Sequence, residues 1–174
     1  MKRNLMVMLS LSVMLAFVAQ GNLNAQAGKT SFAGSWAFNA EKSDQPQQGG
    51  GGGGRGMFGG DFIAKQDGNL LQVERTRTNP QSGETTTTTT KYTLDGKESV
   101  NTSARGESKS VATWSADGKS LTINTALSFT GQDGTVRETK LKEVWTITGT
   151  ELTIVSTSPT QDGERVVKRV YTKK

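Results

Sequence analysis

The sequence predicts an all-β protein: an antiparallel up-and-down β-barrel of about 8–10 strands, with little helix apart from an N-terminal signal peptide. Five Asp-Gly pairs punctuate the chain, beginning at Asp67, Asp95, Asp117, Asp133 and Asp162. Asp-Gly favours the two-residue type I′ hairpin turn, because both central residues then take a positive φ. Between the pairs, apolar and polar residues alternate as in strands, and no helical period is visible after residue 28.

The first 27 residues have the three parts of an export signal. A basic start is followed by an apolar stretch at 5–18 and by the small-x-small cleavage site Ala25-Gln26-Ala27. The apolar stretch has about 14 residues, short of the roughly 20 that a membrane-spanning helix needs. We therefore expect a signal peptide at 1–27 and a mature protein that is periplasmic or extracellular and not membrane-spanning. Residues 28–174 then form a single barrel domain.

Two absences limit the chemistry, since the chain contains no Cys and no His. Disulfides, thiolate metal sites, an acylated lipoprotein cysteine and a cysteine nucleophile are excluded. So are a Ser-His-Asp triad and an imidazole zinc site. What remains is carboxylate, Lys, Tyr or Arg chemistry, or simple binding. We expect no catalytic residue, no metal and no cofactor, although an enzyme stays possible.

Charge does not indicate a nucleic-acid partner. Removal of Lys2 and Arg3 with the signal peptide lowers the formal net charge from +5 to +3. The remaining basic residues are scattered among acids, and only Lys168, Arg169, Lys173 and Lys174 cluster. A nucleic-acid surface would need a stripe of positive charge with stacking aromatic side chains. The oligomeric state is not indicated.

A glycine-rich segment interrupts the strand pattern. It contains six consecutive glycines at 49–54, which lose too much backbone entropy on ordering to hold a helix or strand. We expect a flexible loop at about 44–60. A phosphate-binding loop would need a Lys-Ser/Thr pair after the glycines, and none follows. Met57 and Phe58 are the apolar residues of this loop, and either enter the barrel mouth or are incidental.

The strand pattern begins with Trp36 and Phe38 on one face and continues with Leu71 and Val73. Thr85 to Thr90 is a β-branched run suited to an exposed strand. Later stripes include Ala112 with Trp114, the long series from Leu121 to Phe129, Trp145 with Ile147, and Leu152 with Ile154. The expected strands are 33–40, 61–66, 69–78, 85–94, 97–104, 109–116, 119–129, 135–148, 151–160 and 163–173.

Serial strands joined by tight turns favour a closed barrel over a β-sandwich. An open sheet would expose two edges that invite aggregation, and closure removes both. A sandwich would need long crossover connections, and the consecutive hairpins leave little room for them. A barrel of this size holds side chains or one small ligand in its interior.

Both ends of the mature chain resemble a known family. Phe32-Ala33-Gly34-Ser35-Trp36 resembles the Phe-x-Gly-x-Trp opening of calycin barrels, the group that holds lipocalins and fatty-acid-binding proteins. Arg169-Val170-Tyr171 is similar to the Arg-x-Tyr of the last strand in fatty-acid-binding proteins. The continuation from Phe38 to Ser43 resembles small exported lipocalin-like proteins of bacteria. The chain departs from fatty-acid-binding proteins where its glycine-rich segment replaces their helical lid.

The resemblance implies roles for particular residues. Gly34 and Trp36 would form the structural motif at one barrel end, with Arg169 or Arg165 packed over the indole ring. Arg169 and Tyr171 would reach a ligand carboxylate in the interior, because a guanidinium binds a carboxylate in a bidentate manner. The alternative is that Arg169 only covers Trp36 and Tyr171 only fills the core.

Three functions remain open from the sequence. The first is a non-catalytic binding protein for a small hydrophobic, amphipathic or carboxylate-bearing ligand. The second is a surface protein–protein interaction module with a filled barrel. The third is an enzyme that draws on groups from this set: Tyr92, Tyr171, Glu74, Glu138 and Glu143. The three glutamates stand beside basic residues, and we interpret them as solvated cross-strand charge pairs.

Overall fold

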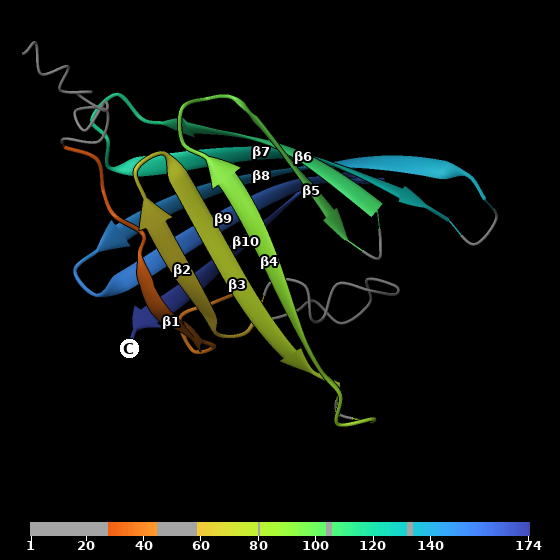
Figure 1. Cartoon of the computed structure of the whole chain (residues 1–174), viewed down its shortest axis with the longest axis horizontal. Coiled ribbons are helices and arrows are strands. Elements are labelled where there is room, and N and C mark those ends of the chain that lie inside the picture. Colours follow the sequence, from red (N-terminus) through yellow and green to blue (C-terminus); the bar gives the residue numbers. More distant parts are fainter. Residues whose placement is uncertain (1–27, 45–58, 80, 104–105, 132–133) are drawn as a thin grey trace, which may run out of the picture.

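The computed structural model describes residues 28–44, 59–79, 81–103, 106–131 and 134–174, and in these residues it contains ten strands and no helix (Figure 1). The strands are β1 (Gly34–Asn39), β2 (Phe62–Asp67), β3 (Leu70–Thr78), β4 (Thr85–Thr93), β5 (Glu98–Ser103), β6 (Gly106–Trp114), β7 (Ser120–Thr130), β8 (Val136–Thr148), β9 (Glu151–Thr160) and β10 (Gly163–Lys173). The ten expected strands are confirmed. The largest shift is in β6, which begins at Gly106 rather than at 109.

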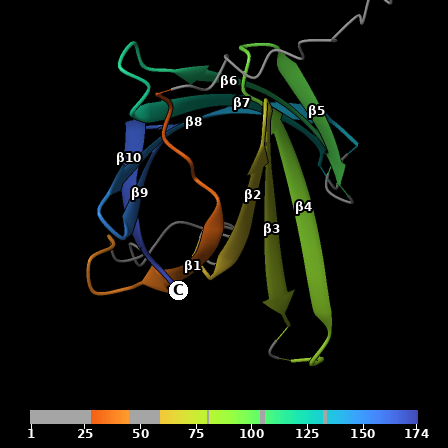
Figure 2. The same ribbon diagram turned by 60° about the vertical axis from the view of Figure 1, so that its left-hand side comes forward.

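One antiparallel sheet holds all ten strands in the order β4-β3-β2-β1-β10-β9-β8-β7-β6-β5. The first and last strands pair, with Trp36 opposite Lys173 and Asn39 opposite Val170. This pairing curls the sheet into a nearly closed barrel (Figure 2). The predicted all-β up-and-down barrel is therefore confirmed. No helix in the described part of the chain could span a membrane.

The prediction of type I′ turns is wrong. Among the described residues, positive φ occurs only at glycines, and at the two-residue turn between β2 and β3 Gly68 has a φ of 49° while Asn69 does not share it. Asp95 and Asp117 act through their carboxylates, each of which accepts the backbone N–H two residues on, at 3.2 and 3.1 Å. In such an Asx turn the aspartate side chain stabilises the bend, and the aspartate itself keeps a negative φ. The 133–134 pair lies partly outside the described residues.

The barrel seam lies between β4 and β5, where side chains replace a backbone ladder. The Asn101 side chain accepts the N–H of Lys91 at 2.8 Å and donates to the carbonyl of Lys91 at 2.9 Å. The Ser99 hydroxyl accepts the N–H of Thr93 at 2.7 Å. One amide side chain thus supplies the donor and acceptor that a paired strand would offer. Thr93 adds a hydroxyl contact with Ser99 and a hydrogen bond to the carbonyl of Lys97, each at 3.0 Å. Among the described residues, side chains rather than a backbone ladder therefore close the barrel between β4 and β5.

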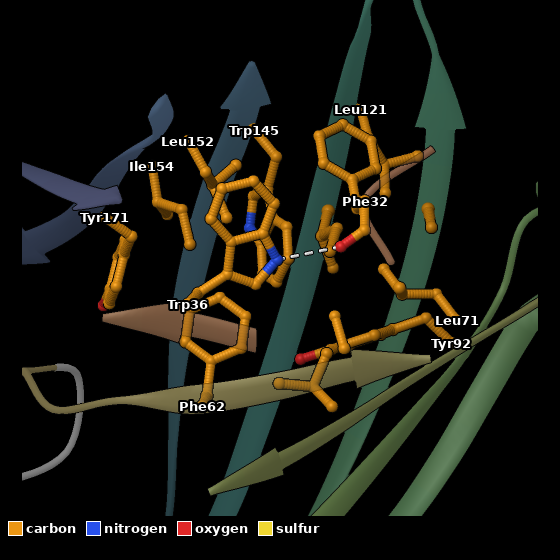
Figure 3. Close-up of a cluster of buried hydrophobic side chains, with 14 of the residues drawn as sticks. Phe32, Trp36, Phe62, Leu71, Tyr92, Leu121, Trp145, Leu152, Ile154 and Tyr171 are labelled. Carbon is orange, nitrogen blue, oxygen red and sulfur yellow. Dashed lines mark hydrogen bonds between the residues drawn. The ribbon is translucent and has the colours of Figure 1, made fainter. Parts of the chain in front are cut away.

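The N-terminal segment before β1 closes one end of the barrel, which we call the closed end. Thr30 donates its N–H to the carbonyl of Gly118 at 2.9 Å, and Phe32 is fully buried. The Trp36 indole N–H donates to the Phe32 carbonyl at 3.0 Å (Figure 3). The Phe32 ring lies 5.7 Å from those of both Trp114 and Trp145. Aromatic side chains therefore fill this end.

The closed end belongs to one continuous hydrophobic core drawn from most strands of the barrel. Its members alternate along each strand, as expected for inward-facing positions. Besides Phe32, Trp36 and Trp145, the core consists of Phe62, Ala64, Leu71, Val73, Tyr92, Leu94, Ala112, Leu121, Ile123, Leu152, Ile154 and Tyr171.

Phe32→Ala should destabilise the fold strongly, because the ring is fully buried between two tryptophans. A buried Phe→Ala change costs about 3–5 kcal/mol, through lost burial and the cavity left behind. The free energy of unfolding from urea denaturation measures the loss. Val166→Ala is the control, since Val166 is 59% exposed and should cost less than about 0.5 kcal/mol. Equal effects of the two changes would contradict a packed closed end.

Candidate functional site

Charged side chains enter the barrel interior immediately beyond the aromatic core. Arg75 on β3, Glu143 on β8 and Arg169 on β10 each lie one inward-facing position beyond a core residue, in the direction away from Phe32. The adjoining core residues are Val73, Trp145 and Tyr171. We call these three side chains, together with Ser156 of β9, the interior polar cluster. It divides the interior into an apolar half at the closed end and a polar half.

Ser156 links the charges of β8 and β10. The register places Ser156 directly opposite Glu143 on one side and opposite Val167 on the other. Its hydroxyl donates to Glu143 Oε1 at 3.4 Å and accepts Arg169 Nη1 at 3.3 Å. The chain of hydrogen bonds holds a guanidinium and a carboxyl on opposite sides of one hydroxyl, and Ser156 itself is buried.

Glu143 is the acid of the cluster and is buried, with 5% of its surface exposed. Burial raises the pKa of Glu143 above its ordinary value, because desolvation disfavours the charged form. The positive charges of Arg75 and, more weakly, Arg169 oppose that rise. The net direction is upward, so the site holds the Glu143 proton more tightly than water would.

Two tyrosines line the same region, and burial raises the pKa of both phenols. For Tyr171, the charges of Arg75 and Arg169 and a hydrogen bond to Arg75 pull in the other direction. For Tyr92, the negative charge of Glu143 adds to the rise. Both phenols therefore stay protonated at neutral pH, as donors rather than bases.

Arg75 packs against an aromatic ring and one of its donors is unpaired. Its guanidinium carbon lies 4.9 Å from the centre of the Phe62 ring, and its side chain forms a hydrogen bond with Tyr171. Its Nε is buried and has no hydrogen-bond partner among the described residues. The buried indole nitrogen of Trp145 also has none within hydrogen-bonding distance, although it favours the ionised form of the neighbouring Glu143 carboxyl. The Nε of Arg75 is thus a buried donor without an acceptor among the described residues.

The sequence-predicted residues divide between the two halves of the barrel. Arg169 belongs to the polar cluster, and Tyr171 packs at its border, with ring centres 4.9 Å from Phe62 and 5.6 Å from Phe38. Met57 and Phe58 lie outside the described residues, as do most of the predicted glycine-rich loop and the predicted signal peptide.

Lys173, rather than Arg169 or Arg165, occupies the place over the Trp36 ring, with Nζ 5.8 Å from the ring centre. Lys173 is directly opposite Trp36 in the β1–β10 register, whereas Arg169 lies four residues earlier, about 13 Å along the strand. Gly34 leaves room for the lysine, because a Cβ there would come within 2.9 Å of Lys173 Cε. Arg165 is exposed on β10.

Sequence reasoning missed Arg75, Ser156 and the burial of Glu143. The interpretation of the glutamates as solvated pairs holds for Glu74, which lies 3.0 Å from Lys65 across the strands, and is wrong for Glu143. The signal was present in the alternation of β8, where Glu143 shares the face of Trp145 and Ile147.

Two other features of the described residues were candidates for a functional site, a surface hollow and a metal site. A hollow of about 420 Å³ on the surface is lined by Ser103, Gly106, Glu107, Ser128, Phe129, Thr130 and Val136. None of these belongs to the interior polar cluster. Within the described ranges, no group of three or more acidic side chains is arranged to hold a metal ion.

Glu143→Gln should stabilise the protein increasingly as pH rises. With a folded-state pKa raised above the unfolded one, the stability from protonated Glu143 is complete at low pH and is lost as pH rises through the folded pKa. Gln stays neutral throughout. The free energy of unfolding of the variant, relative to wild type, should therefore increase as the pH rises above 4.5, the ordinary pKa of the group, as urea denaturation would show.

Glu74→Gln is the matched control with the opposite sign. The hydrogen bond from Lys65 lowers the pKa of Glu74, so wild type gains stability from it as pH rises. A difference between Glu143→Gln and wild type that stays constant with pH would contradict the buried, proton-retaining acid.

No protein-family model and no curated protein sequence matches the chain. Several solved structures are similar to it, among them the following three. The zebrafish ileal bile acid-binding protein complexed with cholic acid is 23% identical over 66% of this chain and 72% of that one, with a TM-score of 0.45. A REP1-NXSQ fatty acid transporter is 12% identical over 82% and 95%, with a TM-score of 0.47. Secretory abundant heat soluble protein 4 from Ramazzottius varieornatus is 16% identical over 82% and 94%, also at 0.47. The chain forms a nearly closed ten-stranded antiparallel barrel, the architecture that the resemblance of its two terminal motifs to calycin barrels implies.

Proposed function

We propose that the protein is an exported, non-catalytic binding protein that holds one small amphipathic ligand with an acidic head group in the polar half of its barrel. The observation that carries the proposal is the unpaired buried donor of Arg75. Its Nε has no partner among the described residues, and the positive charges of Arg75 and Arg169 both act on the carboxyl of Glu143. A buried donor without an acceptor destabilises the protein, and a ligand carboxylate would remove this penalty by accepting the hydrogen bond.

The surroundings of the cluster suit the rest of such a ligand. Leu127, Leu141 and Val167 are half-buried inward positions on β7, β8 and β10, further from the closed end than the cluster. An acidic head group at Arg75 and Arg169 would leave an apolar tail along these side chains toward the barrel mouth. Apolar walls with a few convergent polar groups are typical of small-molecule sites.

A filled barrel that acts only through its surface is the second candidate. It is favoured by the aromatic packing of the closed end, where Phe32, Trp114 and Trp145 are in contact. Catalysis by a tyrosine base is disfavoured, because burial raises the pKa of both interior phenols. The choice between binding and a filled barrel depends on whether the polar half admits a ligand.

Binding of a fluorescent fatty acid tests the proposal, with Arg169→Gln and Arg75→Gln as variants. Each change removes charge-assisted hydrogen bonds worth about 1.5–3 kcal/mol, so the dissociation constant should rise roughly 10- to 100-fold. Lys173→Gln removes a cation at the closed end, over Trp36, and should leave the affinity unchanged.

A fatty alcohol of the same chain length separates the head group from the tail. It lacks the carboxylate, so its affinity should be lower and insensitive to both arginine changes. Native mass spectrometry of the protein purified from its own cells then looks for a co-purifying lipid-sized mass. If the purified protein carries no bound mass and binds neither probe, the binding proposal is wrong and the filled barrel is the better account.

A further inference from the structure

Among the described residues, no strand pairs with the outer part of β4 on the side away from β3, so this part of β4 is a sheet edge. Residues 85–89 are exposed, and in the part of the chain that the structure describes β4 meets β5 through side-chain contacts at Lys91 and Thr93. Both views show β4 and β5 diverging from the seam, with β4 running on beside β3 (Figures 1 and 2). A strand edge of this kind presents a row of unpaired N–H and C=O groups.

The seam shows which backbone groups lie on this edge. The N–H and C=O of Lys91 both point away from β3, toward Asn101. The pairing of β3 with β4 is continuous from Leu70–Thr93 to Thr78–Thr85, without a bulge, so the direction alternates residue by residue. Thr85, Thr87 and Thr89 therefore direct their N–H and C=O groups to the free edge, and Thr86 and Thr88 direct theirs to β3.

This edge lacks the usual features that prevent strand pairing. Proteins commonly protect an edge with a charged side chain, a proline or a bulge. The six residues from Thr85 to Thr90 are all threonine, a β-branched residue well suited to strands. Their pairing with β3 is regular, and cross-strand hydroxyl contacts such as Thr76 with Thr87, at 3.0 Å, link the two strands.

We propose that the β4 edge is a self-association surface, whose partner is the β4 edge of a second copy of this chain. The two strands run antiparallel about a two-fold axis through Thr87. Thr85 of each copy then lies opposite Thr89 of the other, and the two Thr87 residues face each other. All three edge-facing residues of each strand find partners, because an antiparallel ladder pairs residues of the same direction.

Charge permits this arrangement. Thr86 and Thr88, on the inward face, would lie opposite each other across the new junction, and the charged neighbours Arg75 and Arg77 stand on β3 behind them. The arginines of the two copies are then separated by three strand spacings, about 14 Å, which is beyond the screening length of about 8 Å at physiological salt. No like charges meet. The contact is small, so the dimer should be weak and dependent on concentration.

Thr87→Pro and Thr87→Ala form the matched pair that tests the proposal. Both lose the hydroxyl contact with Thr76, but only proline removes the edge-facing N–H, and neither removes a hydrogen bond to β3. The protein is expressed from the 174-residue sequence and purified with whatever N-terminal processing the cells carry out. Light scattering should show a mass that rises toward twice the monomer value with concentration for wild type and Thr87→Ala, and a constant monomer mass for Thr87→Pro.

Amide exchange of the wild type gives an independent readout, which does not depend on the proline variant folding. The N–H groups of Thr85, Thr87 and Thr89 should exchange more slowly as concentration rises, whereas Thr86 and Thr88 are protected at every concentration. A monomer at all concentrations with these three amides unprotected would overturn the proposal. So would a folded Thr87→Pro protein that dimerises as wild type does, because the interface would then lie elsewhere.

Discussion

The pairing of β1 with β10 is the constraint on which the rest of the structure depends. It joins the two ends of a ten-stranded meander, and its register sets Trp36 opposite Lys173 and Phe38 opposite Tyr171. The lysine covers the indole because of this register. Phe32 lies across the barrel end, where its carbonyl accepts the indole N–H of Trp36. Without it, β1 and β10 would be exposed edges. Closure therefore creates both the core and the interior in which Arg169 lies.

The interior places unlike environments next to each other. At the closed end, aromatic side chains are in ring-to-ring contact and leave the Trp36 nitrogen satisfied. One inward position further, Glu143 is buried among arginines, and Ser156 bridges it to Arg169. Burying charge is costly unless partners compensate, and compensation here is incomplete for the guanidinium of Arg75. Arg75 alone therefore contributes little to stability. Its unpaired donor is better explained if Arg75 belongs to a binding site.

Much of the fold follows from local pattern, whereas the site depends on register. Alternation predicts all ten strands, and the motifs around Trp36 and Arg169 predict where the chain ends meet. The periodicity of β8 could have placed Glu143 inside, but the basic residues around it favoured a solvated charge pair. The cation that covers Trp36 is set by the register between β1 and β10. This register cannot be read from the sequence of either strand alone. The side-chain seam at Asn101 likewise becomes visible only when the strands are placed together.

The arginine side-chain Nε–H signals in a nitrogen-15 NMR titration with a medium-chain fatty acid test most directly whether the polar half of the barrel is a ligand site. We expect the signals of Arg75 and Arg169 to shift and their exchange with water to slow as the carboxylate binds. The indole signal of Trp36 at the closed end should not move. Unchanged signals for both arginines at saturating fatty acid, or shifts confined to the exposed Arg165, would contradict an interior binding site.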